Sequence, residues 1–141
     1  RPLRRAVLLG NGGASRAVQA ALADAGADVT VVDRKRWSEL RSAVANADLL
    51  VNATPIGTGS AETPVPAALL RPELVVLVLA YQPTPTRLVR DARAVGAPAQ
   101  GGAGMLLTQA VLSFELCTGR RAPTEVMAEA LRAELGGEVD A

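Results

Sequence analysis

The hydrophobic positions of the chain form short unbroken runs, which alternate with longer stretches whose apolar residues recur at helical spacing. The runs cover residues 6–9, 29–32, 48–52 and 73–79, with a shorter one at 97–100. Continuous apolar runs of this length are typical of parallel strands buried on both faces. Helical patterns cover residues 14–25, 39–44, 84–96, 105–118 and 124–135. Strands that alternate with helices predict an α/β fold, a doubly wound parallel sheet with C-terminal helices.

Length and composition indicate one folded domain without a general affinity for polyanions. The chain has 141 residues, of which 49% are hydrophobic and 21% are charged, which suffices for a buried core. We expect the domain to cover residues 1–135 and residues 136–141 to form a flexible tail. The formal charge of +1 predicts no nucleic-acid partner and no membrane partner.

Residue types that bind metals or form disulfides are scarce. The chain has one cysteine, Cys117, and no histidine, so we expect neither an internal disulfide nor a metal site. A reducing, cytoplasmic location follows as the simplest interpretation. The first residue is Arg1 rather than methionine, and we expect the sequence to be part of a longer protein.

A glycine-rich turn joins the first predicted strand to the first predicted helix. The first glycine permits the tight turn, Gly12 lets a pyrophosphate approach the backbone, and Ser15 is small enough for close packing of helix on strand. Free N–H groups at the helix start then face the phosphates. The turn predicts a Rossmann-like dinucleotide site, although an ordinary strand-to-helix turn has similar residues. Its members are Gly10, Asn11, Gly12, Gly13, Ala14 and Ser15.

The end of the second strand leaves the choice of dinucleotide open. Asp33 can accept hydrogen bonds from both ribose hydroxyls, which favours NAD. Arg34, Lys35 and Arg36 offer positive charge and donors for a 2′-phosphate, which favours NADP. A solvated charged loop is the third interpretation.

Four blocks of sequence resemble the C-terminal, cofactor-binding domain of the shikimate dehydrogenase and quinate/shikimate dehydrogenase family. Together they span nearly the whole chain, and the last block is more specific than the glycine turn. They are residues 7–16 (VLLGNGGASR), 51–57 (VNATPIG), 81–83 (YQP) with Thr86 and Leu88, and 102–110 (GAGMLLTQA).

The resemblance implies a role for each matching position. The glycine turn holds the pyrophosphate of NADP, and Arg34 meets the adenosine phosphate with Lys35 beside it. The resemblance also places Asn52, Ala53 and Thr54 beside the nicotinamide-side ribose, Gly102 and Met105 at the nicotinamide, and Tyr81 and Gln109 in the shikimate pocket. In the plainer alternative, Asn52 and Thr54 shape a turn and Met105 belongs to the core. Tyr81 is then a partly buried aromatic side chain, and Gln109 is an amide on a helix face.

The reaction that the resemblance implies is reversible hydride transfer between NADP(H) and 3-dehydroshikimate or shikimate, in aromatic amino-acid biosynthesis. The family places its proton donor, a lysine and an aspartate, in an N-terminal domain that this sequence lacks. We therefore expect the chain to bind cofactor, to be inactive alone, and to self-associate, for example as a homodimer, through the exposed edge at Tyr81 and Gln109. The alternatives are a non-catalytic dinucleotide-binding module, a shikimate-sensing module, and an NAD-dependent quinate/shikimate dehydrogenase.

The sequence departs from the family pattern at three places. Only 14 residues separate Asp33 from Asp48, so we expect the sheet to lack one edge strand, which affects the outer wall of the adenine pocket. Either the affinity for the cofactor is lower for that reason, or the protein has residues here that this sequence does not contain. Val78 and Arg87 occupy positions where the family commonly has an aspartate and a proline. Both lie toward the substrate side, which leaves shikimate, quinate and a relative as candidate substrates.

Overall fold

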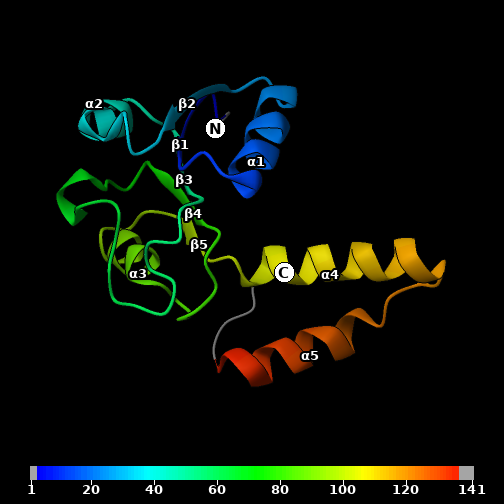
Figure 1. Ribbon diagram of the computed structural model, residues 1–141. Coiled ribbons are helices and arrows are strands. Elements are labelled where there is room, and N and C mark those ends of the chain that lie inside the picture. Colours follow the sequence, from blue (N-terminus) through cyan, green and yellow to red (C-terminus); the bar gives the residue numbers. More distant parts are fainter. Residues whose placement is uncertain (1–2, 137–141) are drawn as a thin grey trace.

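The sheet has five parallel strands in the order β2-β1-β3-β4-β5, and this confirms the predicted doubly wound α/β fold. The computed structural model describes residues 3–136 (Figure 1). Each expected strand is present. The first two begin one residue earlier than expected, and the last three are shorter by one, three and two residues. The strands are β1 (Arg5–Leu9), β2 (Asp28–Val32), β3 (Leu49–Asn52), β4 (Val75–Val78) and β5 (Ala99–Gln100).

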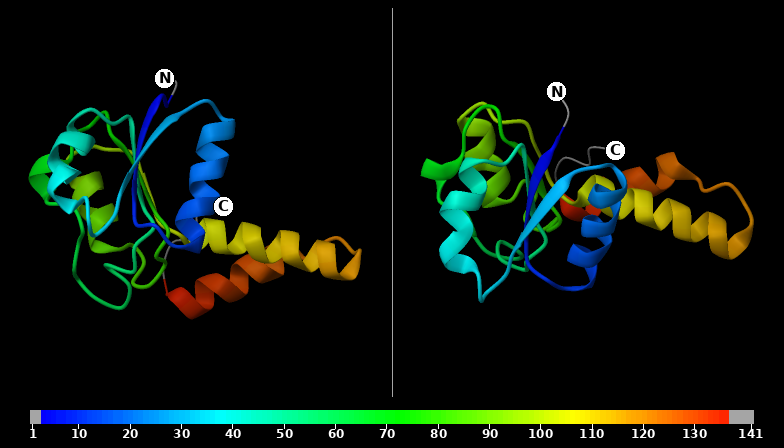
Figure 2. Two further views of the ribbon diagram at one scale, coloured as in Figure 1. Left: turned by 45° about the horizontal axis from the view of Figure 1, so that its top comes forward. Right: turned by 90° about the horizontal axis from the view of Figure 1, so that it is seen from above.

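Helices cover both faces of the sheet because every central strand is apolar on both sides. On one face, Val18 and Leu22 of α1 pack over Leu8 and Val51. On the other face, α2 and α3 enclose the larger core around Leu9 and Leu50 (Figure 2). The helices are α1 (Gly13–Asp24), α2 (Leu40–Ala45), α3 (Arg87–Ala94), α4 (Ala103–Thr118) and α5 (Thr124–Leu135), with short 3-10 turns η1 (Trp37–Glu39) and η2 (Ala67–Leu69).

The crossover between β2 and β3 is short and leaves β2 at the edge of the sheet. η1 and α2 carry the chain past β1, which pairs with β2 on one side and β3 on the other. The predicted loss of an edge strand is thereby confirmed, and the sheet survives because the missing strand is not needed between β1 and β3.

An arginine side chain occupies part of the edge that the missing strand leaves open. The backbone N–H of Asp28 and the backbone carbonyl of Val32 form hydrogen bonds with the segment that contains β1. Because the direction of the backbone polar groups alternates along a strand, those of Val31 point away from β1, toward the open edge. Arg36 Nη1 donates to the carbonyl oxygen of Val31 at 3.0 Å. Arg36 Nε and Nη2 in turn donate to the two carboxylate oxygens of Glu39 at 3.0 and 2.6 Å.

Helices α4 and α5 form a hairpin, called here the arm, that projects away from the sheet (Figure 2). The arm has its own small core, in which Ala103 and Leu107 of α4 pack against Ala128 of α5. Gly119, with φ +64°, ends α4 in the left-handed conformation that allows the chain to reverse. Among residues 3–136, no helix has the length and apolar character needed to cross a bilayer.

Two helix starts differ from the sequence expectation by two residues or more. α3 begins at Arg87 rather than at residue 84 because Thr86 caps it, its Oγ1 accepting a hydrogen bond from Val89 N. α4 begins at Ala103, two residues before the expected start at Met105. The expected flexible tail lies outside the described residues except for Gly136, which ends α5 with φ +63°.

Candidate functional site

An open hollow of about 580 Å³ lies at the carboxyl ends of β2, β1 and β3. In a doubly wound sheet this is the edge at which ligands bind, close to the point where the strand order reverses. Three segments supply its lining, namely the glycine turn after β1, the start of the crossover after β2, and the turn after β3. The lining residues are Gly10, Asn11, Gly12, Asp33, Arg34, Lys35, Trp37, Ala53, Thr54, Pro55 and Ile56.

The glycine turn is built for close approach of a ligand to the backbone. Gly10 has φ +100°, and a Cβ atom there would lie 3.2 Å from the carbonyl oxygen of Ala53. Ser15 Oγ, which is buried, donates to the carbonyl oxygen of Gly10 at 2.7 Å and holds the turn. A Cβ at Gly12 meets nothing within 4 Å, so the space beside the start of α1 is open.

The start of α1 provides partial positive charge at this opening. Gly12 is its N-cap, no side chain caps the helix, and its first turn contains no acidic residue. The first N–H groups of a helix have no carbonyl partner within the helix, and together with the helix dipole they attract an anion. The arrangement suits the pyrophosphate of a dinucleotide.

Asp33 organises the loop that follows β2. Its Oδ1 accepts hydrogen bonds from Lys35 N at 2.9 Å and from Arg36 N at 3.2 Å. The hydrogen bond from Lys35 N is the main cause that lowers the pKa of this carboxyl, while desolvation acts in the opposite direction and the Asn11 side chain adds a further hydrogen bond. Asp33 therefore carries its charge at neutral pH and turns Arg34 and Lys35 toward the hollow that both residues line.

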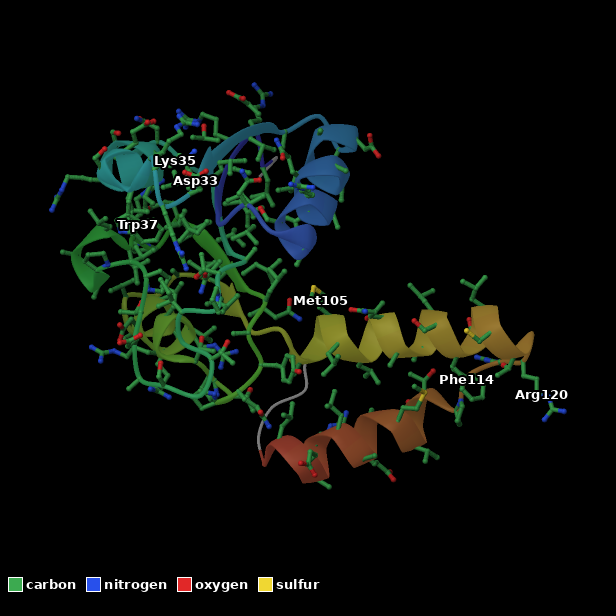
Figure 3. All side chains as sticks on the ribbon, in the orientation of Figure 1. Asp33, Lys35, Trp37, Met105, Phe114 and Arg120 are labelled. Carbon is green, nitrogen blue, oxygen red and sulfur yellow. The ribbon has the colours of Figure 1, made fainter. Side chains whose placement is uncertain are left out.

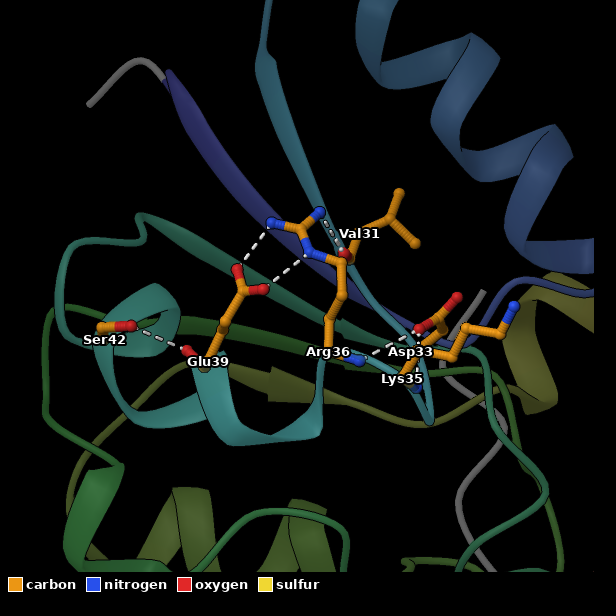
Figure 4. A network of polar contacts seen from close by, with 6 residues as sticks. All are labelled: Val31, Asp33, Lys35, Arg36, Glu39 and Ser42. Atoms are coloured by element: carbon orange, nitrogen blue, oxygen red, sulfur yellow. Dashed lines mark hydrogen bonds and ion pairs between the residues drawn. The ribbon is translucent and has the colours of Figure 1, made fainter.

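The three cations of this loop have different tasks. Arg36 is held by Glu39 and by the edge of β2, as Figure 4 shows, and does not line the hollow. Hydrogen bonding to Glu39 raises the pKa of Arg36 and lowers that of Glu39. Arg34 and Lys35 are exposed, and among residues 3–136 their side chains form no ion pair or hydrogen bond. Two of the three cations thus remain for a phosphate.

Asn52 and Thr54 shape the turn after β3. The buried Asn52 Oδ1 accepts hydrogen bonds from Thr54 N at 3.0 Å and Thr54 Oγ1 at 2.6 Å. Asn52 Nδ2 donates to the carbonyl oxygen of Ile56 at 3.2 Å. Thr54 and Ala53 line the hollow, whereas Asn52 does not and acts by fixing the turn.

The residues expected on the nicotinamide and substrate side lie apart from this hollow. Gly102 N donates to the carbonyl oxygen of Ala80 at 3.2 Å, so Tyr81 leaves β4 beside the start of α4. Met105 and Gln109 line a second hollow, of about 520 Å³, along α4. Figure 3 shows Met105 at the root of the arm, away from Asp33 and Lys35.

The structure thus brings eight of the expected cofactor residues together and leaves six outside the first hollow. The eight are Gly10, Asn11, Gly12, Asp33, Arg34, Lys35, Ala53 and Thr54, and the six are Gly13, Ala14, Ser15, Asn52, Gly102 and Met105. Three lining residues had no sequence-based role: Trp37, Pro55 and Ile56. Trp37 is the single tryptophan of the chain. Its position two residues after Lys35 was the available sequence signal that it lines the same site.

The chemistry of the first hollow is that of an anion and nucleotide site. It combines a helix start, two cations and four apolar side chains, but the described residues hold no group of three or more His, Cys, Asp or Glu placed to bind a metal ion. Lys35 lies with the glycine turn, in a different hollow from Met105 and Gln109.

Curated proteins that match this chain include several NADP-dependent shikimate dehydrogenases. The family model "Shikimate 5'-dehydrogenase C-terminal domain" matches residues 102–132. Over 150 residues the chain is 49% identical to shikimate dehydrogenase (NADP(+)) of Halorubrum lacusprofundi, covering 94% of this chain and 55% of that protein. The chain spans about half the length of the curated relatives it matches.

Solved structures agree with this assignment. Shikimate 5-dehydrogenase from Thermus thermophilus, in complex with NADP(H) and shikimate, matches with a TM-score of 0.79 and 38% identity over 91% of this chain and 54% of that chain. Quinate dehydrogenase from Corynebacterium glutamicum, in complex with NAD, matches with a TM-score of 0.78 and 29% identity over 93% of this chain and 55% of that chain. The chain therefore belongs to the shikimate dehydrogenase family, in which it corresponds to the C-terminal domain.

Proposed function

We propose that this domain binds NADP for a shikimate dehydrogenase. The observation that carries the proposal is the hollow in which the uncapped start of α1 lies beside Arg34 and Lys35. The helix start suits the pyrophosphate, and the two cations suit the 2′-phosphate that distinguishes NADP from NAD. The relative from Halorubrum lacusprofundi is named as NADP-dependent.

In this proposal the domain supplies cofactor binding and part of the substrate pocket. NADPH, when bound, supplies the hydride that reduces 3-dehydroshikimate to shikimate. Gly102 and Met105 border the nicotinamide, and Tyr81 and Gln109 contact the substrate. The lysine and aspartate that transfer the proton belong to a separate N-terminal domain, so this chain alone is expected to show no turnover.

The decisive test is calorimetric titration of the chain with NADP and, separately, with NAD. We expect Arg34→Gln combined with Lys35→Gln to weaken NADP binding on the order of tenfold, because charge-assisted hydrogen bonds to the 2′-phosphate are lost. NAD binding is expected to change less than about twofold, since NAD lacks that phosphate.

Arg41→Gln is the control for a general loss of positive charge, because it removes one such charge, half of the loss in the double variant, from an exposed position in α2 of the same crossover. It is expected to leave both affinities within about twofold of the unmodified chain. An equal loss of NAD and NADP binding in the double variant would contradict the assignment of these cations to the 2′-phosphate. Failure of the unmodified chain to bind either nucleotide would refute the proposed function.

NAD-dependent oxidation of quinate or shikimate is the second candidate. Asp33 favours it, because an ionised carboxylate in the hollow suits ribose hydroxyls better than a phosphate. The same titration distinguishes the two, since tighter binding of NAD than of NADP selects this candidate.

We also propose that the isolated chain self-associates through α4. Leu112 and Leu116 in the second hollow are 61% and 87% exposed, and Tyr81 and Met105 are about 40% exposed. Apolar side chains grouped in this way mark an interaction surface. Light scattering over a range of concentrations is expected to show a mass above that of the monomer, and Leu116→Glu is expected to restore the monomer.

Val126→Glu on α5 provides the control for this substitution, because Val126 is 64% exposed and lies outside the second hollow. A monomer at every concentration of the unmodified chain would count against self-association.

The location we propose is the cytoplasm, whose reducing conditions suit the exposed and unpaired Cys117.

A further inference from the structure

We propose that the indole ring of Trp37 is the surface on which the adenine base of the cofactor stacks. The proposal rests on the proposed function, because it assumes that a dinucleotide occupies the first hollow. It assigns an adenine wall to the shortened crossover between β2 and β3, the segment that is too short to hold the missing edge strand.

Trp37 is well placed for this task. It is half-buried, packs against the larger core at one side, and lines the hollow together with Ala53, Pro55 and Ile56. Figure 3 shows it beneath α2, on the same side of the molecule as Asp33 and Lys35. The chain has one Trp, one Tyr and one Phe, and Trp37 is the aromatic residue that lines the described hollow.

The covalent structure of the cofactor places the base near this ring. The adenine is attached to C1′ of the ribose, and the 2′-phosphate is attached to the neighbouring carbon. A 2′-phosphate held by Arg34 and Lys35 therefore positions the base beside the residues that follow them, and Trp37 comes two residues after Lys35. Base stacking on an aromatic side chain is favourable for every base.

The loop that carries the ring is held in place by hydrogen bonds within the chain. Trp37 begins η1, and Arg36 immediately before it is fixed by Glu39 and by the carbonyl of Val31 (Figure 4). Asp33 accepts the backbone N–H groups of Lys35 and Arg36 and fixes the same loop. A preorganised aromatic wall loses little conformational entropy when the base stacks on it.

The first measurement needs no substitution, because Trp37 is the single tryptophan and its fluorescence reports the site directly. Two probes are compared. The first is 2′,5′-ADP, which carries adenine, a 2′-phosphate and a 5′-phosphate, and the second is inorganic pyrophosphate, which carries no base. We expect 2′,5′-ADP to quench the emission and to protect it from acrylamide, and pyrophosphate to do neither. Calorimetry gives the concentration at which 2′,5′-ADP saturates the chain. If 2′,5′-ADP does not protect the emission at that concentration, the proposal is overturned.

The second measurement is the affinity of variants for 2′,5′-ADP. Trp37→Leu is expected to weaken binding on the order of tenfold or more, and Trp37→Phe, which keeps a ring, is expected to retain most of the affinity. Phe114→Leu is the matched control, because Phe114 lies on the arm, away from Trp37 (Figure 3), and it is expected to change the affinity less than about twofold. Circular dichroism checks that each variant is folded.

The outcomes separate this proposal from the proposed function. Unchanged affinity of folded Trp37→Leu, with NADP binding intact, overturns the role of Trp37 and leaves NADP binding in place. Loss of binding in Trp37→Leu with retention in Trp37→Phe supports the stacking wall. If the unmodified chain binds no nucleotide, both proposals are refuted.

Discussion

Gly102→Ala is expected to lower the free energy of unfolding by about 3 kcal/mol or more, the upper part of the range for overpacked sites. A Cβ atom on Gly102 would lie 1.9 Å from the carbonyl oxygen of Leu79 and 2.5 Å from its carbonyl carbon. Both atoms are backbone, so no side chain can turn aside to make room. Relief requires movement of the end of β4 or of the start of α4, which breaks the hydrogen bond from Gly102 N to Ala80 O.

Gly101→Ala is the matched control, because a Cβ on the neighbouring glycine meets nothing within 4 Å. We expect it to change the free energy of unfolding by less than about 0.5 kcal/mol. Urea denaturation followed by circular dichroism and by Trp37 fluorescence measures both variants. Equal stability of the two variants would contradict the close approach of Gly102 to the backbone of Leu79.

Gly12→Asp is expected to weaken nucleotide binding by about a hundredfold or more, while leaving the fold at least as stable as before. Gly12 has φ −90° and ψ −171°, the extended conformation of an ordinary N-cap, and aspartate is among the best N-cap residues. The new carboxylate is therefore expected to cap α1 and to raise its stability by a few tenths of a kcal/mol. The same carboxylate fills the open space beside the helix start and repels the pyrophosphate.

Ala20→Asp, at an exposed position of the same helix, introduces the same charge away from the hollow and is expected to bind NADP within about threefold of the unmodified chain. Thermal denaturation and calorimetric titration together test the prediction. A variant that binds NADP as tightly as the unmodified chain would mean that the phosphates lie elsewhere. A large loss of stability in Gly12→Asp would contradict the open space at this position.

The sheet was predictable from the sequence because its strands are buried on both faces. β1, β3 and β4 each read as an unbroken apolar run, and the glycines of the turn after β1 mark where the strand ends and α1 begins. The missing edge strand was also predictable, because the number of residues between Asp33 and Asp48 is too small to hold it. Local composition and chain length decide these features.

The distribution of tasks among the charged and aromatic side chains was not predictable. Arg34, Lys35 and Arg36 are equivalent in sequence, and only the 3-10 turn of η1 brings Glu39 back to Arg36. Trp37 offered no periodic signal, because its contacts come from segments distant in the chain. Met105 and Gln109 share a helix with the residues that pack on α5, and the choice of face depends on how the arm leaves the sheet.

The two edges of the sheet also determine how the domain resists aggregation. An exposed strand edge is a template on which a second chain can add by backbone hydrogen bonding. At one edge, the guanidinium of Arg36 donates a hydrogen bond to the outward-facing carbonyl oxygen of Val31. It thereby places a positive charge where an incoming strand would lie. At the other edge, β5 has two residues, Ala99–Gln100, which are too few to nucleate a ladder. Each edge of this sheet thus has a feature that disfavours the addition of a further strand.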